Sequence, residues 1–267
     1  MSLSGDRSLD HVLAAGHRLR LQHIAGPAGQ SGPTLVFLHE GLGSIPQWRD
    51  FPTLLCAAAG LPGLVYERYG HGGSDAVSLP RPDDFLKIEA EQALPDLLAA
   101  CGIDRPILVG HSDGGTIALY YAALVAPPLA CITLAAHVML EATTQGGLAG
   151  VMGRWRDDPE FVARLARYHG DRTESMFRGW AETWTRESMR DWSMVDLLPQ
   201  ITCPVLAIQG DSDAHGSWAQ VETIIDKVSG PAEAFEVPAC GHVPHLEAGP
   251  LVIDRIVSFL NSIRQQQ

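Results

Sequence analysis

The sequence lacks the features of a membrane-spanning or exported protein. No run approaches the roughly 18–20 consecutive apolar residues that cross a bilayer, and residues 1–16 lack the basic flank and apolar core of a secretory signal. Basic residues are also few: 19 Lys and Arg stand against 31 Asp and Glu, a net charge of −12 that repels nucleic-acid phosphates and anionic lipids. We therefore expect a cytoplasmic protein that binds neither nucleic acid nor membranes.

Cysteine and metal-binding patterns are sparse as well. The five cysteines form no CxxC pair and leave one over if paired, so we expect reduced, buried thiols rather than a disulfide framework. No HExxH or HxH-type cluster occurs, which argues against a metal site. Repeats, low-complexity tracts and flexible linkers are absent. With 267 residues and 46% hydrophobic content the chain can close one sizeable core, so we predict a single domain over residues 1–267.

What the chain does contain is an alternation of short apolar runs with helical stretches. The runs are nearly continuous and bounded by Gly, Pro or Asp, which is typical of strands buried on both faces of a parallel sheet. Residues 85–101 instead space their apolar side chains for one buried helix face. This alternation predicts an α/β fold with a doubly wound, mostly parallel sheet, and residues 9–24 as an antiparallel pair at its edge. The runs are residues 34–38, 64–66, 107–109, 131–135 and 204–208.

Residues 139–198 break this alternation, because they contain no strand-like run and concentrate the tryptophans. We predict that they form a helical cap inserted within the single domain. Phe177, Trp180 and Trp184 recur at spacings of three and four, which places them on one helix face. Two interpretations of this stripe stay open: it packs the cap onto the body, or it lines an apolar substrate cleft.

The segment Gly110-His-Ser-Asp-Gly-Gly115 follows a predicted strand and precedes a helix-compatible run over residues 116–125. This is the context of a nucleophile elbow, a sharp strand-to-helix turn that needs small residues around the serine and lifts its hydroxyl above the sheet. The helix N-terminus behind the serine favours developing negative charge. The pattern therefore predicts that Ser112 is a nucleophile.

A serine hydroxyl needs a neighbouring base, and in this architecture a histidine should follow the last strand. Residues 235–237 form that strand candidate, and the loop after it contains both His242 and His245. We favour His242 because Gly241 gives the loop freedom to turn beside it.

The imidazole in turn needs a carboxylate that fixes its tautomer, expected between the serine and the histidine in chain order. Asp211 and Asp213 both follow the strand over residues 204–208. We favour Asp213 as the acid and interpret Asp211 as a turn residue whose side chain binds local backbone amides.

These motifs resemble those of the α/β-hydrolase superfamily, occur in the same order along the chain and extend over nearly its whole length. Three further segments share the resemblance: Leu38-His-Glu-Gly-Leu-Gly-Ser44, Arg68-Tyr-Gly-His-Gly-Gly-Ser74 and the segment from Gly241 to Pro250. Because a serine stands at position 112, the sequence is similar to the esterase and enol-lactonase branch, in which the nucleophile is serine. The sequence departs from the family at Glu40, where glycine is usual, and at Asp113, where an uncharged residue is commoner.

The resemblance implies an oxyanion hole made by the backbone amides of Gly41 and Asp113. It also suggests scaffold roles for His39, His71 and His111. Glu40 has three open interpretations: it pairs with a cation, Arg68 first and Arg49 second, it is protonated by desolvation, or it binds a cationic or hydroxylated substrate group. The candidate substrate-binding residues are Glu40, His137, Trp180 and Trp184.

The function expected from these residues is a serine hydrolase that cleaves a small to medium carboxylic ester or lactone through an acyl-enzyme. Its partner is a small-molecule substrate, it needs no cofactor, and a homo-oligomeric state is left open. Two alternatives remain: a carbon–carbon bond hydrolase acting on a vinylogous diketone, which would use the same three residues, and a ligand-binding relative without turnover.

Overall fold

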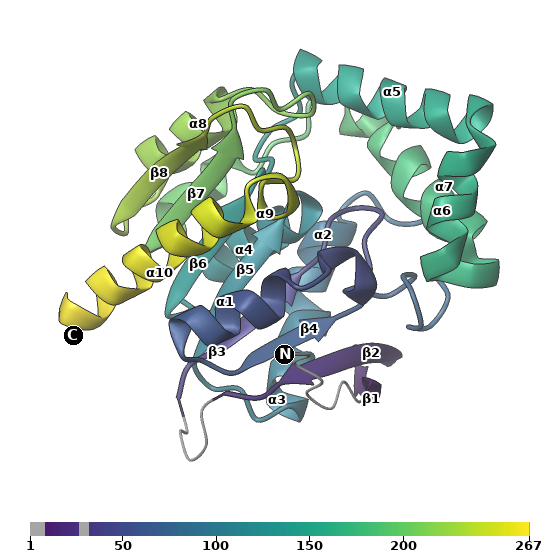
Figure 1. Ribbon diagram of the computed structural model, residues 1–267. Helices are drawn as coiled ribbons and strands as arrows, with labels where there is room; N and C mark the ends of the chain where they lie inside the picture. Colours follow the sequence, from purple (N-terminus) through teal and green to yellow (C-terminus); the bar gives the residue numbers. More distant parts are fainter. Residues whose placement is uncertain (1–8, 27–31, 267) are drawn as a thin grey trace.

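The computed structural model describes residues 9–26 and 32–266 (Figure 1). Residues 1–8 lie outside this description. They form the first half of the segment, residues 1–16, in which we expect no export signal. Within the described residues no helix combines the length and apolar character that a membrane span requires. The five cysteines carry free thiols, and four of them are buried.

Eight strands of the described residues form one sheet in the order β1-β2-β4-β3-β5-β6-β7-β8. The strands from β3 to β8 pair in parallel, whereas β1 and β2 form the antiparallel pair predicted for residues 9–24 at one edge. This sheet confirms the predicted α/β fold. The strands are Leu9–Ala14, His17–Ile24, Thr34–Leu38, Gly63–Tyr66, Pro106–His111, Ala130–Leu134, Val205–Gly210 and Ala232–Val237.

Helices cover both faces of the sheet, and the alternating side chains of the strands divide the core into two layers. Along β3, Leu35 and Phe37 join the layer under α1 (Phe51–Ala59) and α10 (Gly249–Gln266), which lie in front of the sheet in Figure 1. Val36 and Leu38 join the opposite layer. That layer is covered by α3 (Leu94–Ala100), α4 (Asp113–Leu124) and α8 (Ala219–Lys227). The continuous apolar runs of the sequence thus correspond to strands buried on both sides.

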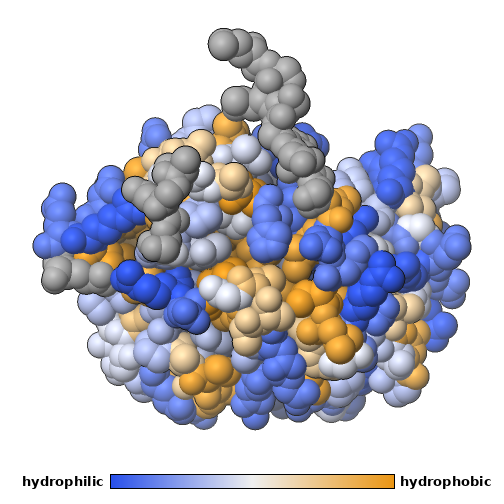
Figure 2. Space-filling model, turned by 90° about the horizontal axis from the view of Figure 1, so that it is seen from below, coloured by the Kyte–Doolittle hydropathy of each residue, from blue (hydrophilic) through white to orange (hydrophobic). Residues whose placement is uncertain are grey.

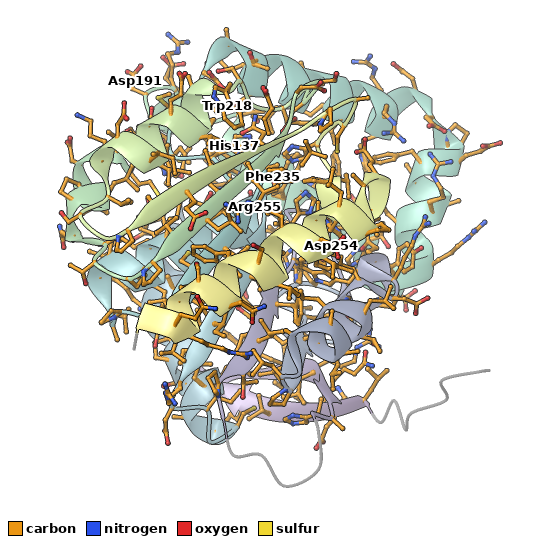
Figure 3. All side chains as sticks on the ribbon, turned by 60° about the vertical axis from the view of Figure 1, so that its left-hand side comes forward. His137, Asp191, Trp218, Phe235, Asp254 and Arg255 are labelled. Carbon is orange, nitrogen blue, oxygen red and sulfur yellow. The ribbon has the colours of Figure 1, made fainter. Side chains whose placement is uncertain are left out.

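The C-terminal helix α10 also packs against the last strand. On this helix the guanidinium carbon of Arg255 lies 5.8 Å from the ring centroid of Phe235 on β8 (Figure 3). Arg255 also forms an ion pair with Glu233. On the face seen from below, hydrophobic patches lie between hydrophilic residues (Figure 2).

The helix predicted over residues 85–101 is divided into three parts. The segments α2 (Phe85–Ile88) and α3 flank a π-helical turn over Glu89–Ala93. Pro95 stands at the start of α3 and has no N–H to donate to a carbonyl one turn earlier, and its ring would clash with that carbonyl. The wider π turn accommodates both constraints, a feature that apolar spacing alone does not predict.

Between β6 and β7 the chain is helical. It forms α5 (Ala142–Asp157), α6 (Pro159–His169) and α7 (Thr173–Trp184), with 3₁₀ turns at Gly170–Arg172, Glu187–Met189 and Val195–Gln200. A single bridge between Met139 and Ser193 closes the segment near its base. The three helices lie together at one end of the molecule, at the upper right of Figure 1.

Candidate active site

Ser112 stands at the sharp turn between β5 and α4, with φ of 51° and ψ of −119°. This left-handed backbone is strained for a residue with a side chain, a cost found mostly at functional sites. The flanking glycines are required by packing. A Cβ at Gly110 would collide with the Gly114 carbonyl, a Cβ at Gly114 would collide with the Leu38 carbonyl, and a Cβ at Gly115 would lie 2.7 Å from the Ala136 Cβ. The turn therefore forms only with small residues around the serine.

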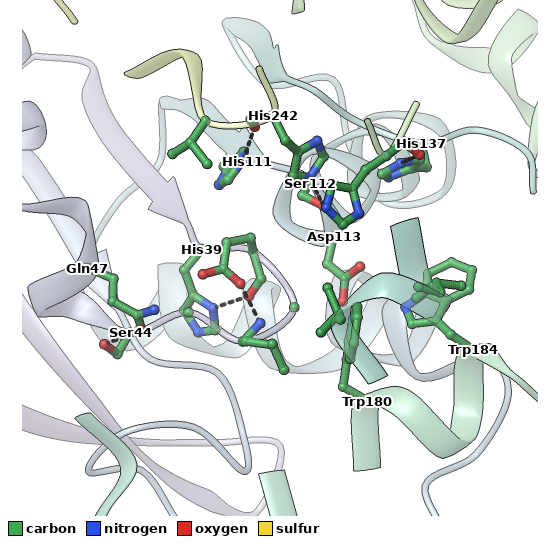
Figure 4. A pocket seen from close by; sticks show the side chains of 18 of the residues that line it. His39, Ser44, Gln47, His111, Ser112, Asp113, His137, Trp180, Trp184 and His242 are labelled. Carbon is green, nitrogen blue, oxygen red and sulfur yellow. Dashed lines mark hydrogen bonds between the residues drawn. The ribbon is translucent and has the colours of Figure 1, made fainter. Parts of the chain in front are cut away.

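The turn brings Ser112 to His242, which lies in the loop after β8. The Nε2 atom of His242 lies 3.1 Å from the Ser112 Oγ, within hydrogen-bonding distance (Figure 4). On the other side of the ring, Nδ1 lies 2.9 Å from each carboxylate oxygen of Asp213. Burial would raise the pKa of Asp213, but the hydrogen bond and charge of His242 and the bond from the His215 amide bring this pKa below its usual value. Serine, imidazole and an ionised carboxylate thus form one connected chain.

The two competitors for these positions lie elsewhere. His245 is buried against Trp48, with ring centroids 4.6 Å apart, and has no hydrogen bond to Ser112 within the described residues. Asp211 accepts from the Ala239 amide at 3.0 Å and from the Cys240 amide at 3.2 Å. It therefore ties the start of the histidine loop to β7, as expected for a turn residue.

His111 connects the nucleophile turn to the histidine loop. Its Nε2–H donates to the main-chain carbonyl of His242 at 2.8 Å (Figure 4). Burial, together with the neighbouring His245, lowers the pKa of His111 well below its usual value, so the ring is neutral and serves as a donor in the scaffold.

The loop after β3 lies beside Ser112 and contains Gly41. A Cβ at Gly41 would collide with the indole nitrogen of Trp180, so only glycine allows the loop to pass under this ring. Within the described residues, neither the Gly41 amide nor the Asp113 amide has a protein acceptor. Both residues line the cavity above the serine. Their two N–H groups are therefore available to a ligand atom.

Buried histidines hold this loop in place, as the sequence predicts. His39 accepts from the Arg68 amide through Nε2 at 3.0 Å, so its Nδ1 carries the proton and donates to the Glu40 carbonyl at 2.7 Å. The Nε2 of His71 lies 3.0 Å from the Gly41 carbonyl.

The side chain of Glu40 does not form the ion pair with Arg68 that was its first interpretation. Its carboxylate accepts a short hydrogen bond from the Leu42 amide, and Arg68 bonds the main-chain carbonyl of Glu40 instead, at 2.8 Å. Arg49, the second choice, forms no ion pair with it within the described part of the chain. Burial raises the pKa of Glu40 to about 7, against the lowering effects of the Leu42 bond and Arg68. Protonation by desolvation therefore describes this group better than an ion pair.

Replacement of Glu40 by Gln is expected to change how stability depends on pH. Because the pKa is raised in the folded state, the folded protein retains a proton that the unfolded chain loses between pH 4.5 and 7, so wild-type stability falls over this range. Glutamine keeps an acceptor for Leu42 but cannot ionise. Above pH 7 the free energy of unfolding of the variant should exceed that of the wild type by up to about 3 kcal/mol. Near pH 4.5 the two free energies should be equal. Denaturant unfolding of both proteins at pH 5, 7 and 8 measures this difference, and parallel curves would contradict it.

A cavity of about 410 Å³ opens above Ser112, a size suited to a small or medium ligand. Its wall combines the loop after β3, the histidine loop and side chains from α5, α6 and α7. Trp180 and Trp184 line it, whereas Phe177 turns away and stacks on Trp155 with ring centroids 3.9 Å apart. The Phe177 contact lies within residues 139–198, because Trp155 belongs to α5, so it does not pack this segment onto the body. Trp184 also contacts Phe85 of α2, with ring centroids 6.1 Å apart, and this contact does pack the segment onto the body. The apolar side chains of α5, α6 and α7 that line the cavity are Leu148, Val151, Phe161, Leu165, Trp180 and Trp184.

Two further histidines lie beside His242. His137, a candidate substrate-binding residue, lines the cavity, but its Nε2–H donates to the His215 carbonyl at 3.0 Å, and burial lowers its pKa to about 4. The ring of His215, which sequence analysis did not select, lies 4.5 Å from the ring of His242. Its position two residues after Asp213, in a loop at the end of a strand, is the signal that points to it. Burial lowers the pKa of His215 to about 4 as well, so both neighbours are neutral near pH 7. Among the described residues no cluster of three or more His, Cys, Asp or Glu has the arrangement of a metal site.

Comparisons with known proteins agree with this fold. The profile of the Alpha/beta hydrolase family matches residues 35–255. The 2-succinyl-6-hydroxy-2,4-cyclohexadiene-1-carboxylate synthase of Yersinia pseudotuberculosis is 29% identical over 233 residues, covering 84% of this chain and 70% of that protein.

Two solved structures show the same fold. A membrane phospholipase A described as a bacterial virulence factor is similar with a TM-score of 0.80 at 22% identity, covering 97% of this chain and 87% of that chain. The enol-lactonase from Burkholderia xenovorans LB400 has a TM-score of 0.71 at 20% identity, covering 94% of this chain and all of that chain (100%). The resemblance predicted from the motifs is confirmed at the level of the superfamily, and this protein belongs to the alpha/beta hydrolase family.

Proposed function

We propose that this protein is a serine hydrolase that cleaves a small to medium carboxylic ester or lactone through an acyl-enzyme. The observation that carries the proposal is the connected series from Ser112 Oγ to His242 Nε2, at 3.1 Å, and from His242 Nδ1 to Asp213, at 2.9 Å. The largely apolar cavity above the serine supports a substrate with an apolar portion.

In the proposed reaction Ser112 Oγ attacks the substrate carbonyl while His242 Nε2 accepts the hydroxyl proton. The carbonyl oxygen becomes an oxyanion that accepts hydrogen bonds from the Gly41 and Asp113 amides. As the tetrahedral intermediate collapses, the alcohol leaves with the proton from His242. Water then attacks the acyl carbon while His242 accepts its proton, and the bond to Ser112 Oγ breaks as His242 returns that proton to the serine oxygen, which releases the carboxylic acid and restores the enzyme.

We also propose that residues 139–198 act as a cap on the single domain. The support is that α5, α6 and α7 supply one wall of the cavity and that all lie between β6 and β7. Substrate selection by acyl-chain length would then depend on this segment, with Trp184 and Leu148 as the residues to vary.

Two measurements test the proposed activity. A fluorophosphonate probe should label the wild type at Ser112, as located by peptide mass spectrometry. A panel of p-nitrophenyl esters of graded acyl length should then show turnover with an optimum among short to medium chains. Absence of both labelling and turnover would rule out the proposed ester hydrolase.

The aligned relative is named a synthase, which favours a second candidate: a reaction other than hydrolysis, in which Ser112 and His242 would act together as a general base on a substrate proton. Such a reaction needs no covalent intermediate. Intact-protein mass spectrometry after rapid quenching separates the two, because only the hydrolase accumulates an acyl group on Ser112 with ester substrates.

Substitution of Gly41 by Ala tests the proposed oxyanion loop. The new methyl group would collide with the Trp180 indole, so the loop or the ring must move and the Gly41 amide is displaced. We expect turnover of a p-nitrophenyl ester to fall about 10–100-fold. Adding Trp180→Ala in the same chain should restore part of the loss by making space. Full activity of Gly41→Ala alone would remove this loop from the mechanism.

A further inference from the structure

Arg68 is fully buried, and no carboxylate of the described residues lies at hydrogen-bonding distance from its guanidinium. Its Nη2 atom donates to the Glu40 carbonyl at 2.8 Å and lies 3.8 Å from the Asp113 carboxylate. Within the described residues, its Nε and Nη1 atoms have no hydrogen-bond partner. Burial of an incompletely paired cation costs folding free energy, so a packing role alone does not explain an arginine here.

The bond from Arg68 acts on one particular peptide group. The carbonyl of Glu40 and the N–H of Gly41 belong to the same planar unit, and in a trans peptide they point in opposite directions. The Glu40 carbonyl accepts from three donors: Arg68 Nη2 at 2.8 Å, His39 Nδ1 at 2.7 Å and the Gly43 amide at 3.1 Å. These bonds fix the carbonyl and therefore fix the direction of the Gly41 N–H.

A charged donor on the carbonyl also strengthens the N–H at the other end of the peptide. Hydrogen bonds in series polarise one another, and a bond from a guanidinium is stronger than one from a neutral donor. The same guanidinium lies beside the carboxylate of Asp113. The main-chain amide of Asp113 is the second proposed oxyanion donor. One cation therefore stands behind both donors, and it offsets the negative charge of the Asp113 carboxylate beside it.

We propose that Arg68 is a positioning residue for the oxyanion hole: it orients and polarises the Glu40–Gly41 peptide so that the Gly41 amide stabilises the transition state. This inference rests on the proposed serine-hydrolase function. It assigns a task to the Arg68 side chain that none of the three triad residues performs.

The test compares Arg68→Met with Arg81→Met as a matched control. Arg81 is a second buried arginine in the same region, but it donates to the Tyr69 carbonyl at 3.3 Å and its guanidinium lies 4.5 Å from the ring centroid of Phe85. For each variant, kcat and KM are measured with the best p-nitrophenyl ester. The inhibition constant of a trifluoromethyl ketone of the same acyl length is measured alongside, because this inhibitor forms an oxyanion on the serine.

Arg68→Met should lower kcat about 10–100-fold with KM within about threefold of wild type, as expected when an interaction of the transition state is weakened. The inhibition constant of the trifluoromethyl ketone should rise by the same factor by which kcat/KM falls. Arg81→Met should change each quantity less than about threefold, since it leaves the Glu40–Gly41 peptide bonded.

Three outcomes are distinguished: failure of the inference, failure of the variant to fold, and failure of the proposed function. A loss of less than threefold in kcat for Arg68→Met, or a rise in KM without weaker ketone binding, would overturn it. If Arg68→Met does not fold, the comparison is made between Arg68→Met/Asp113→Asn and Asp113→Asn alone, where the opposite charge is removed as well and the same factors are expected. If the wild type neither reacts with a fluorophosphonate nor hydrolyses any ester, the proposed function fails, a result distinct from failure of the role of Arg68.

Discussion

Replacing Ser112 by Ala is expected to lower ester turnover by about 10⁴–10⁶-fold while the fold stays intact. The reason is that His242 Nε2, 3.1 Å from the serine oxygen, then has no hydroxyl to activate, and no acyl-enzyme can form. His242→Ala should cause a loss of similar size, because nucleophile and base act as a unit and their losses do not add. Steady-state kinetics with the best p-nitrophenyl ester and thermal unfolding of each variant measure these effects.

His245→Ala provides the matched control, since this residue belongs to the same loop and also borders the cavity. It should cost stability, because a buried ring is removed from its contacts with Trp48 and Phe51, yet kcat should stay within about tenfold of wild type. If His245→Ala were inactive and His242→Ala active, the base would have to be reassigned. Residual turnover above a few per cent in Ser112→Ala would show that another group attacks the substrate.

Asp213→Asn should reduce kcat by about 10⁴-fold. Both oxygens of Asp213 lie 2.9 Å from His242 Nδ1, and the carboxylate keeps the proton on that nitrogen so that Nε2 can accept one from serine. An amide can offer its NH₂ group to the ring, which favours the tautomer with the proton on Nε2. It also removes the negative charge that stabilises the imidazolium during the reaction.

Asp211→Asn is the control for this substitution. The Asp211 side chain accepts from the amides of Ala239 and Cys240 and, within the described part of the chain, forms no hydrogen bond with His242, so an amide oxygen can replace part of its role. Turnover should stay within about tenfold of wild type and stability should fall slightly. Kinetics and unfolding of the two asparagine variants, measured side by side, give the ranking, and the opposite order would make Asp211 the acid.

The sequence predicts the elements whose determinants are local. Short apolar runs between turn residues predict the central strands, because burial on both faces leaves no alternating pattern. The nucleophile turn can be read from its glycines, since Gly110 and Gly114 avoid collisions with main-chain atoms and Gly115 avoids a collision with the Ala136 side chain. Chain order then selects the region of the acid and of the histidine.

The remaining features depend on contacts between distant segments. Arg68 and Glu40 are joined through a main-chain carbonyl rather than through their opposite charges, and no charge pattern distinguishes these two arrangements. The π-helical turn before Pro95 depends on how one missing donor is accommodated. His215 approaches His242 only because two loops from different strands meet above the sheet, so its neighbourhood is visible only in the folded chain.

The bond from His111 to the His242 carbonyl has a mechanical consequence. His111 immediately precedes the nucleophile in the chain and holds the backbone of the base, at 2.8 Å, so the two loops are tethered without using any atom of the triad side chains. We therefore expect a displacement of one loop to be transmitted to the other, so that the separation of the serine oxygen and the imidazole depends less on the position of either loop alone.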